Sequence, residues 1–336
     1  MPGYTSILCT LAFLKMIIVT GAAGFIASYL VGYLNQQGIK DLMLVDDFSR
    51  KDKEKNYLSK KYHSLLNRDQ LFDFLDNTTQ PVEFIFHLGA RTDTTEKDEA
   101  IFNALNFEFS KRIWKFCVEK KCPMVYASSA ATYGLGECGF SDSDLTTLQL
   151  KPLNAYGDSK QRFDLWVLDQ EKNPPFWAGL KFFNVFGPNE YHKGRMASVP
   201  FHIFDTLKSG KTVKLFRSHR PDIKDGEQKR DFVYVKDLAK VCYFLFLQQN
   251  HSGIYNLGSG KARTFKDLAL ACFRACNLEP RLDFIDTPED IRDTYQYFTQ
   301  ADMSKLRGIG YSEEFLSLEE GISEYFRHYL SVGNYF

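Results

Sequence analysis

The chain has 336 residues, of which 44% are apolar and 25% charged, as in ordinary globular proteins. Its 42 basic residues balance its 42 acidic residues, so no net charge favours nucleic acid or an acidic membrane surface as a partner. The seven cysteines form no CxxC pair and no metal-ligand pattern with histidine. We therefore expect no metal site, and an odd number of cysteines without a disulfide framework fits the reducing cytoplasm.

Residues 1–15 contain a short apolar run, residues 7–14, with no basic residue before it. A signal peptide has a positive start and a cleavage site of small residues, and a membrane span needs about 20 apolar residues. We therefore expect an N-terminal extension or a misassigned start, and no membrane segment.

Residues 16–37 have the pattern of a buried strand, a glycine turn and a helix. Residues 16–20 are apolar and largely β-branched, and the turn of residues 21–27 leads into a helical pattern over residues 28–37. Gly21 permits a tight turn, and Gly24 lets the backbone approach a pyrophosphate at the helix N-terminus. A tight turn without a ligand is the alternative. The context favours a dinucleotide held by Gly21, Gly24, Phe25 and Ile26.

A second strand, residues 42–45, ends at two acidic residues, Asp46 and Asp47. An acidic residue at this point holds the adenosine ribose in dinucleotide-binding folds. The nearby cations, Lys53 among them, could instead hold a 2′-phosphate, although a solvated charge run is the commoner fate of such residues. We expect NADP, with NAD possible. Residues 56–80 are mostly polar, and no third strand is predicted there.

The next strand, residues 81–88, ends in small residues that let the chain lie against a cofactor. Asn106 falls on the following helix, where its amide could brace this loop; a place in the core or on a polar helix face is the alternative. The expected cofactor-binding residues here are Leu88, Gly89, Ala90, Arg91 and Asn106.

The candidate catalytic residues lie in the sequence between two further predicted strands, residues 124–127 and 180–183. Ser129 follows the first of them, and Tyr156 and Lys160 lie four residues apart on a predicted helix. Residues at this spacing share a helix face. A phenol has an ordinary pKa near 10, and a nearby cation lowers it toward a useful range. The spacing alone is common by chance, but behind a cofactor-binding half it predicts a catalytic Tyr156, Lys160 and Ser129.

Four motifs together resemble the extended short-chain dehydrogenase/reductase family of nucleotide-sugar enzymes: Gly21-x-x-Gly24-x-x-Ala27, Ser129, Tyr156-x-x-x-Lys160 and Arg230-Asp231-Phe232-Val233. Longer segments are similar to the branch that acts on an ADP-linked heptose, namely residues 127–134, 151–154, 192–199 and 295–302. The resemblance covers nearly the whole chain.

The resemblance implies an α/β fold with a Rossmann-type doubly wound parallel sheet and a smaller C-terminal α/β substrate domain. The NAD(P)-binding domain would span residues 16–187 with a return segment around 231–260. The substrate domain would comprise residues 188–230 and 261–330.

The implied reaction inverts C6 of an ADP-heptose, by transient oxidation with NADP and re-reduction on the other face, in a cytoplasmic homo-oligomer that supplies heptose for the lipopolysaccharide inner core. Tyr156 and Lys193 would be the two acid/base groups, Lys160 would bind the nicotinamide ribose, and Val185 would touch the nicotinamide. Arg230 is the candidate for the substrate phosphates, because arginine makes a bidentate fork. The implied substrate-binding residues are Ser129, Asn184, Lys193, Arg195, His202, Leu215, Phe216, Arg230 and Tyr295.

Two positions depart from the family pattern. Arg195 stands where a small serine is expected, and the aspartate that usually closes the third strand has no clear counterpart. Two alternatives stay open: another family enzyme (a 4-epimerase, a dehydratase or a reductase) and a non-catalytic protein that keeps only the dinucleotide fold. Residues 130–132 lack the acidic pair that dehydratases need, and a non-catalytic protein has no reason to keep both Tyr156 and Lys160.

Overall fold

The computed structural model describes residues 16–292 and 295–336, so the expected N-terminal extension lies outside the described residues. A seven-stranded sheet with the order β10-β6-β5-β4-β1-β2-β3 is parallel at every pairing. The chain thus builds outward in both directions from β1, which is the doubly wound, Rossmann-type arrangement expected. The strands are β1 (Met16–Thr20), β2 (Leu42–Asp46), β3 (Ser64–Asn67), β4 (Val82–His87), β5 (Met124–Ser129), β6 (Trp177–Phe182) and β10 (Gly253–Leu257).

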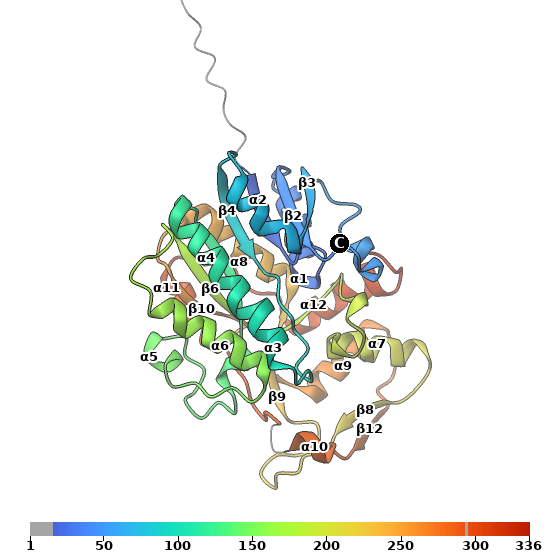
Figure 1. Cartoon of the computed structure of the whole chain (residues 1–336). Coiled ribbons are helices and arrows are strands. Elements are labelled where there is room, and N and C mark those ends of the chain that lie inside the picture. The colour runs from blue at the N-terminus through green and yellow to red at the C-terminus, as the bar shows by residue number, and fades with distance from the viewer. Residues whose placement is uncertain (1–15, 293–294) are drawn as a thin grey trace, which may run out of the picture.

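Helices cover both faces of this sheet (Figure 1). Side chains alternate along a strand, so Ile17 and Val19 pack on one face while Met16 and Ile18 pack on the other. The first face is covered by α1 (Phe25–Gln36) and α8 (Val235–Gln248), and the second by α2 (Leu71–Asn77), α4 (Phe109–Lys120) and α6 (Ala155–Leu168). Burial on both faces explains why these strands are almost wholly apolar.

A smaller α/β part follows, and in Figure 1 its α7, α9, β8 and β12 lie beside one another, away from the large sheet. Its strands form a sheet of order β11-β9-β7 and a pair β12-β8. The strands are β7 (Asn184–Phe186), β8 (Val213–Phe216), β9 (Lys229–Tyr234), β11 (Ala262–Thr264) and β12 (Leu282–Ile285). The helices are α7 (Val199–Lys208), α9 (Phe265–Ala275), α10 (Glu289–Arg292) and α12 (Leu318–Tyr325). The short helix α11 (Ser304–Gly308) instead lies against β10 of the large sheet (Figure 1).

The predicted strands of the large sheet are present, although the strand predicted at residues 180–183 spans Trp177–Phe182 as β6. The predicted start of one helix was wrong, and one strand was missed. Helix α1 begins at Phe25, three residues before the predicted start, because the glycine turn leads directly into it. The polar stretch 56–80 contains the strand β3 at the sheet edge. With four residues and no fully buried one, its apolar run is too short to be recognised by periodicity. Short helices α3 (Glu99–Phe102) and α5 (Asp144–Thr147) complete the fold.

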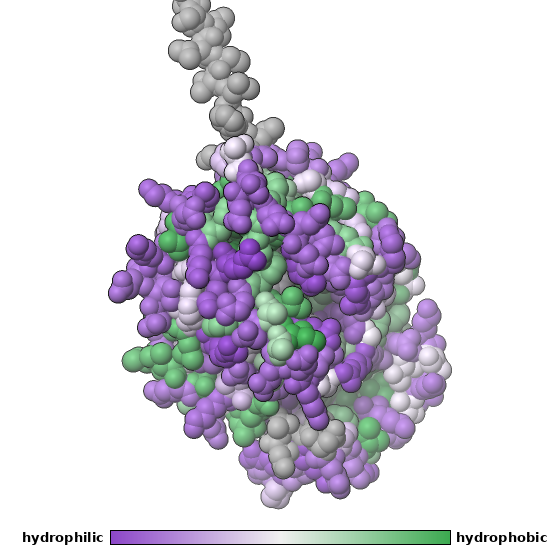
Figure 2. All heavy atoms as spheres, in the orientation of Figure 1, coloured by the Kyte–Doolittle hydropathy of each residue, from purple (hydrophilic) through white to green (hydrophobic). Residues whose placement is uncertain are grey.

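The surface in Figure 2 is largely hydrophilic, with hydrophobic side chains scattered over it. Within residues 16–292 and 295–336, no helix is both long and apolar enough to cross a bilayer. The same residues contain no cluster of three or more His, Cys, Asp or Glu side chains that could hold a metal ion.

Candidate active site

A cleft of about 690 Å³ opens at the carboxyl ends of β1, β2 and β4. This is the crevice where strand order reverses, the usual ligand site of doubly wound sheets. Its walls come from the turn after β1, the end of β2, the loop after β4 and the 3₁₀ segment η5 (Tyr191–Met196). The predicted site residues in these walls are Gly21, Gly24, Phe25, Ile26, Asp46, Asp47, Lys53, Leu88, Gly89, Ala90, Arg91 and Lys193.

Two bare backbone turns meet at the floor of the cleft. Gly21 has φ +70°, and a Cβ there would lie 2.6 Å from the Gly89 Cα, a contact that no side chain permits. A Cβ on Gly24 would lie 2.9 Å from the Gly21 carbonyl oxygen. Helix α1 starts at this point without a side-chain cap and without an acidic residue in its first turn. Exposed N–H groups and a positive helix end fit the pyrophosphate of a dinucleotide.

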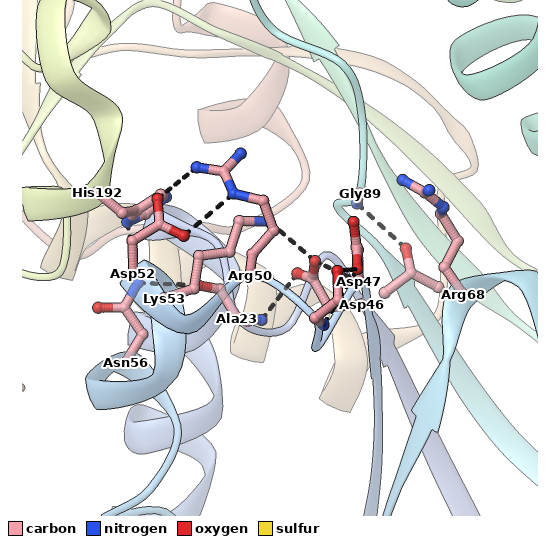
Figure 3. A network of polar contacts seen from close by, with 12 residues as sticks. Ala23, Asp46, Asp47, Arg50, Asp52, Lys53, Asn56, Arg68, Gly89 and His192 are labelled. Atoms are coloured by element: carbon pink, nitrogen blue, oxygen red, sulfur yellow. Dashed lines mark hydrogen bonds and ion pairs between the residues drawn. The ribbon is translucent and has the colours of Figure 1, made fainter.

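The end of β2 carries a charged network (Figure 3). The Asp46 carboxylate accepts the Ala23 N–H at 2.9 Å and pairs with the Lys53 ammonium at 2.9 Å. Asp47 is held by Ser49, whose hydrogen bonds lower the pKa of the Asp47 carboxyl. The Asp46 carboxylate therefore partly neutralises the Lys53 ammonium, which also lines the cleft.

Arg68 is a cleft residue that sequence reasoning missed. It follows β3 directly, and its Nε lies 3.3 Å from the exposed Asp69 carboxylate. The missed strand explains the omission, because a cation becomes notable only once it is known to stand at a strand's carboxyl end. Arg50 also lines the cleft and pairs with Asp52 through its Nε at 3.1 Å.

The loop after β4 is braced as expected. The Arg91 N–H donates to the Asn106 side-chain oxygen at 2.8 Å, and the Asn106 amide nitrogen donates to the Arg91 carbonyl at 3.0 Å. The same nitrogen reaches the Ser159 hydroxyl on α6 at 2.9 Å. Asn106 lies in a π-helical turn, η3 (Asn103–Glu108), a distortion that often marks functional sites. It thus joins the loop after β4 to the helix of Tyr156.

Ser129, Tyr156 and Lys160 come together at the tip of β5. Burial raises the pKa of Tyr156, and the hydrogen bond with the Ser129 hydroxyl opposes this. The Lys160 ammonium donates to the Ala127 carbonyl at 2.8 Å, and burial lowers its pKa to about 8. The expectation that Lys160 lowers the Tyr156 pKa is wrong for this structure, because desolvation of the phenolate dominates and the resulting pKa shift is upward.

A buried ion pair lies behind this tip, and the sequence did not reveal it. Asp164 and Lys181 are both fully buried, with Nζ to Oδ2 at 2.7 Å. Asp164 also accepts the Ser128 hydroxyl at 2.6 Å and the Tyr126 hydroxyl at 3.1 Å. The Lys181 ammonium donates to Thr132 at 2.9 Å. The only sequence signal was Lys181, a lysine inside an apolar strand. The hydrophobic periodicity of the sequence does not show that Asp164 is its partner.

Lys193 stands half-buried on η5 and lines the cleft together with Phe25 of α1, with its ammonium 5.8 Å from the centre of the Phe25 ring. Burial lowers its pKa, and the carboxylate of Glu190 opposes the shift. Arg195 is exposed and reaches Asp93 at 3.4 Å on the loop after β4. The family departure at this position therefore places a bridge between two walls of the cleft.

Three predicted substrate residues form a second cluster. The Arg230 guanidinium lies 5.4 Å from the centre of the Tyr295 ring, and the rings of Tyr295 and Phe216 are 6.1 Å apart. Arg230 is 7% exposed, and burial lowers its pKa. His219, which sequence reasoning missed, lies 6.4 Å from Tyr295.

Other predicted residues are exposed or packed in the core. Asn184 is exposed at the start of β7, with Val185 beside it, and His202 is exposed on α7. The Leu215 side chain packs in the hydrophobic core, so only its backbone can face a ligand.

Comparison with known proteins gives a consistent result. The model of the NAD dependent epimerase/dehydratase family matches residues 17–258. An ADP-L-glycero-D-manno-heptose-6-epimerase of Fusobacterium nucleatum is 47% identical over 94% of this chain and 98% of its own. One of Nitratidesulfovibrio vulgaris is 45% identical over 96% of this chain and 100% of its own. The crystal structure of the Helicobacter pylori ADP-L-glycero-D-manno-heptose-6-epimerase has TM-score 0.78 and 26% identity, and covers 94% of this chain and 96% of its own.

Proposed function

The chain belongs to the NAD dependent epimerase/dehydratase family. We propose that it inverts C6 of ADP-L-glycero-D-manno-heptose, which is the reaction that the names of its relatives describe. The observation that carries this is the identity of 47% and 45% to two such enzymes over nearly the whole of each chain. These relatives favour a 6-epimerase over a 4-epimerase, a dehydratase or a reductase. The product serves as heptose for the lipopolysaccharide inner core.

A nicotinamide dinucleotide is the cofactor, and we propose NADP. The backbone of Gly21 and Gly24 holds the pyrophosphate, and Asp46 and Asp47 border the adenosine ribose. Arg68 and Lys53 would hold the 2′-phosphate of NADP, because arginine binds phosphate through two parallel hydrogen bonds. The chemistry that the bound nicotinamide supplies is the acceptance of a hydride from C6 and its return.

Inversion at C6 needs a proton acceptor on one face of the carbon and a proton donor on the other. No carbonyl neighbours C6, so proton abstraction from carbon is not an available route. Burial keeps the Tyr156 phenol protonated and lowers the pKa of Lys193, which is the direction that a proton acceptor needs. In the proposed cycle Lys193 takes the hydroxyl proton during oxidation, and Tyr156 gives a proton to the aldehyde oxygen after rotation about C5–C6. Lys193 then releases its proton to solvent and Tyr156 takes one up, which restores both groups for the next turnover. The two roles exchange in the reverse direction.

Other residues hold the reacting groups. Ser129 holds the C6 oxygen through its hydroxyl, and Lys160 binds the nicotinamide ribose. Arg230 receives the substrate diphosphate, with Tyr295 and Phe216 as aromatic walls. Asn184, Arg195 and His202 complete the substrate contacts, and Val185 touches the nicotinamide.

We place the protein in the cytoplasm as a homo-oligomer, and light scattering of the purified protein tests the oligomeric state. Product NMR after incubation with ADP-heptose tests the reaction. Inversion at C6 with a C6 deuterium label retained is expected, since hydride leaves and returns within one site. Wash-in of solvent hydrogen at C6, inversion at C4 or no inversion would each overturn the proposal.

A further inference from the structure

The side chain of Asn56 joins the cofactor turn to the segment that carries Lys193 (Figure 3). Asn56 ends the 3₁₀ turn η1 (Lys51–Asn56) and is 1% exposed. Its amide nitrogen lies 2.8 Å from the Ala23 carbonyl oxygen, 3.0 Å from the Asn189 carbonyl oxygen and 3.2 Å from the His192 Nδ1. Burial lowers the pKa of His192 to about 4, so its ring is neutral and can accept a hydrogen bond.

Asn189 makes a second connection to the same cofactor-binding unit. It is fully buried with φ +76°, and its amide nitrogen donates to the Ser28 hydroxyl on α1 at 2.9 Å. Its side-chain oxygen accepts the Phe336 N–H at 2.9 Å, and the Phe336 ring stacks on Tyr29 of α1 with centroids 3.9 Å apart. The start of the segment 189–196 is therefore tied to the cofactor turn and to the helix that follows it.

The position of Lys193 depends on these ties. Within the described chain, no carboxylate lies within ion-pair distance of its ammonium, and the ring of Phe25 is its aromatic neighbour at 5.8 Å. Gly194, the next residue, has φ +52° and no heavy atom within 4 Å of where a Cβ would stand, so packing on that side does not hold the segment. After Lys193, Arg195 reaches Asp93 at 3.4 Å and the Ser198 hydroxyl donates to the Glu190 carboxylate at 2.7 Å. The anchors before Lys193 are the ones that tie it to the cofactor turn.

We propose that Asn56 is a positioning residue that fixes Lys193 relative to the dinucleotide turn. The inference rests on the proposed function, in which Lys193 is an acid/base group. Because Asn56 bonds to both the turn and the segment, a cofactor that orders the turn also orders residues 189–196. Loss of the Asn56 amide uncouples the turn from residues 189–196. The turn can still bind the cofactor, because its glycine backbone is unchanged.

Hydrogen exchange measured with and without NADP⁺ tests the coupling directly, without any sugar. In the wild type, NADP⁺ is expected to slow exchange both at residues 21–27 and at residues 189–196. Asn56→Ala should keep the protection at 21–27 and reduce the protection factors at 189–196 by roughly tenfold, since of its three contacts the two with Asn189 and His192 hold that segment. Asn56→Ser, which retains one donor, should be intermediate and covers the case in which the alanine variant does not fold. Asn35→Ala is the matched control, because its amide also donates to two backbone carbonyls, at 2.9 and 2.8 Å, away from the cleft.

Turnover provides the second arm. Asn56→Ala should lower kcat by roughly tenfold or more with KM changed little, and Asn35→Ala should leave both unchanged. In a Lys193→Ala background Asn56→Ala should cause no further loss, because the two residues act as one unit. Equal loss in both backgrounds, or undiminished protection of 189–196 in the Asn56 variants, would overturn the inference. Failure of the wild type to epimerise ADP-heptose refutes the proposed function instead, and the exchange result still decides the coupling.

Discussion

Replacing Asp164 by asparagine should destabilise the protein strongly although the side chain keeps its shape. Asp164 and Lys181 are both 0% exposed, and Asp164 accepts three hydrogen bonds, from Lys181, Ser128 and Tyr126. The variant leaves an uncompensated ammonium and turns an amide toward donors. Breaking a buried pair in this way costs about 3–5 kcal/mol. With an unfolding entropy of about 2.1 cal/mol/K per residue over 336 residues, the midpoint should fall by roughly 4–7 °C.

Thermal unfolding followed by circular dichroism measures this effect. Asp222→Asn is the control, because its pair with Arg220 is exposed, and it should not shift the midpoint measurably. The double variant Asp164→Leu with Lys181→Met removes both charges and should recover most of the loss, since apolar replacement of a buried pair is often neutral. A midpoint for Asp164→Asn within about 1 °C of the wild type would refute the reasoning.

Three further outcomes are expected. Tyr156→Phe should lower kcat by about 10²–10⁴ while calorimetry still shows ADP-heptose binding, since only proton transfer is lost; unchanged turnover would exclude the acid/base role. Arg68→Ala should weaken NADP⁺ binding to the cofactor-free protein by roughly tenfold and leave NAD⁺ binding unchanged, because a charge-assisted contact to the 2′-phosphate is removed; equal losses would argue against NADP selectivity. Burial lowers the pKa of His87 from 6.5 to about 3. Between these two pH values the unfolded chain therefore binds a proton that the folded chain does not bind. The His87 contribution to stability is thus complete above pH 6.5 and falls by up to about 1.4 kcal/mol per pH unit toward pH 3. Urea unfolding at a series of pH values should therefore show that the unfolding free energy of His87→Gln depends less steeply on pH than that of the wild type.

Much of the cofactor half was predictable because its signals are local. The strand, glycine turn and helix of residues 16–36 follow one another directly, and the spacing of Tyr156 and Lys160 lies within one helical turn. The missed strand β3 removed Arg68 from consideration, since its four residues carry no clear period. The predicted substrate residues were placed by resemblance, and the structure gathers three of them, Phe216, Arg230 and Tyr295, into one cluster.

The sequence by itself determined the fold class, the cofactor turn and the catalytic spacing, because hydrophobic period and glycine placement act over a few residues. Only the tertiary structure decided the protonation of the site. The phenol of Tyr156 has a raised pKa through burial by distant segments, and Lys160 bonds to Ala127 on β5. The bridge from Asn56 to Asn189 likewise joins residues 133 positions apart. Desolvation and such long-range hydrogen bonds depend on where remote parts of the chain lie, which no local pattern encodes.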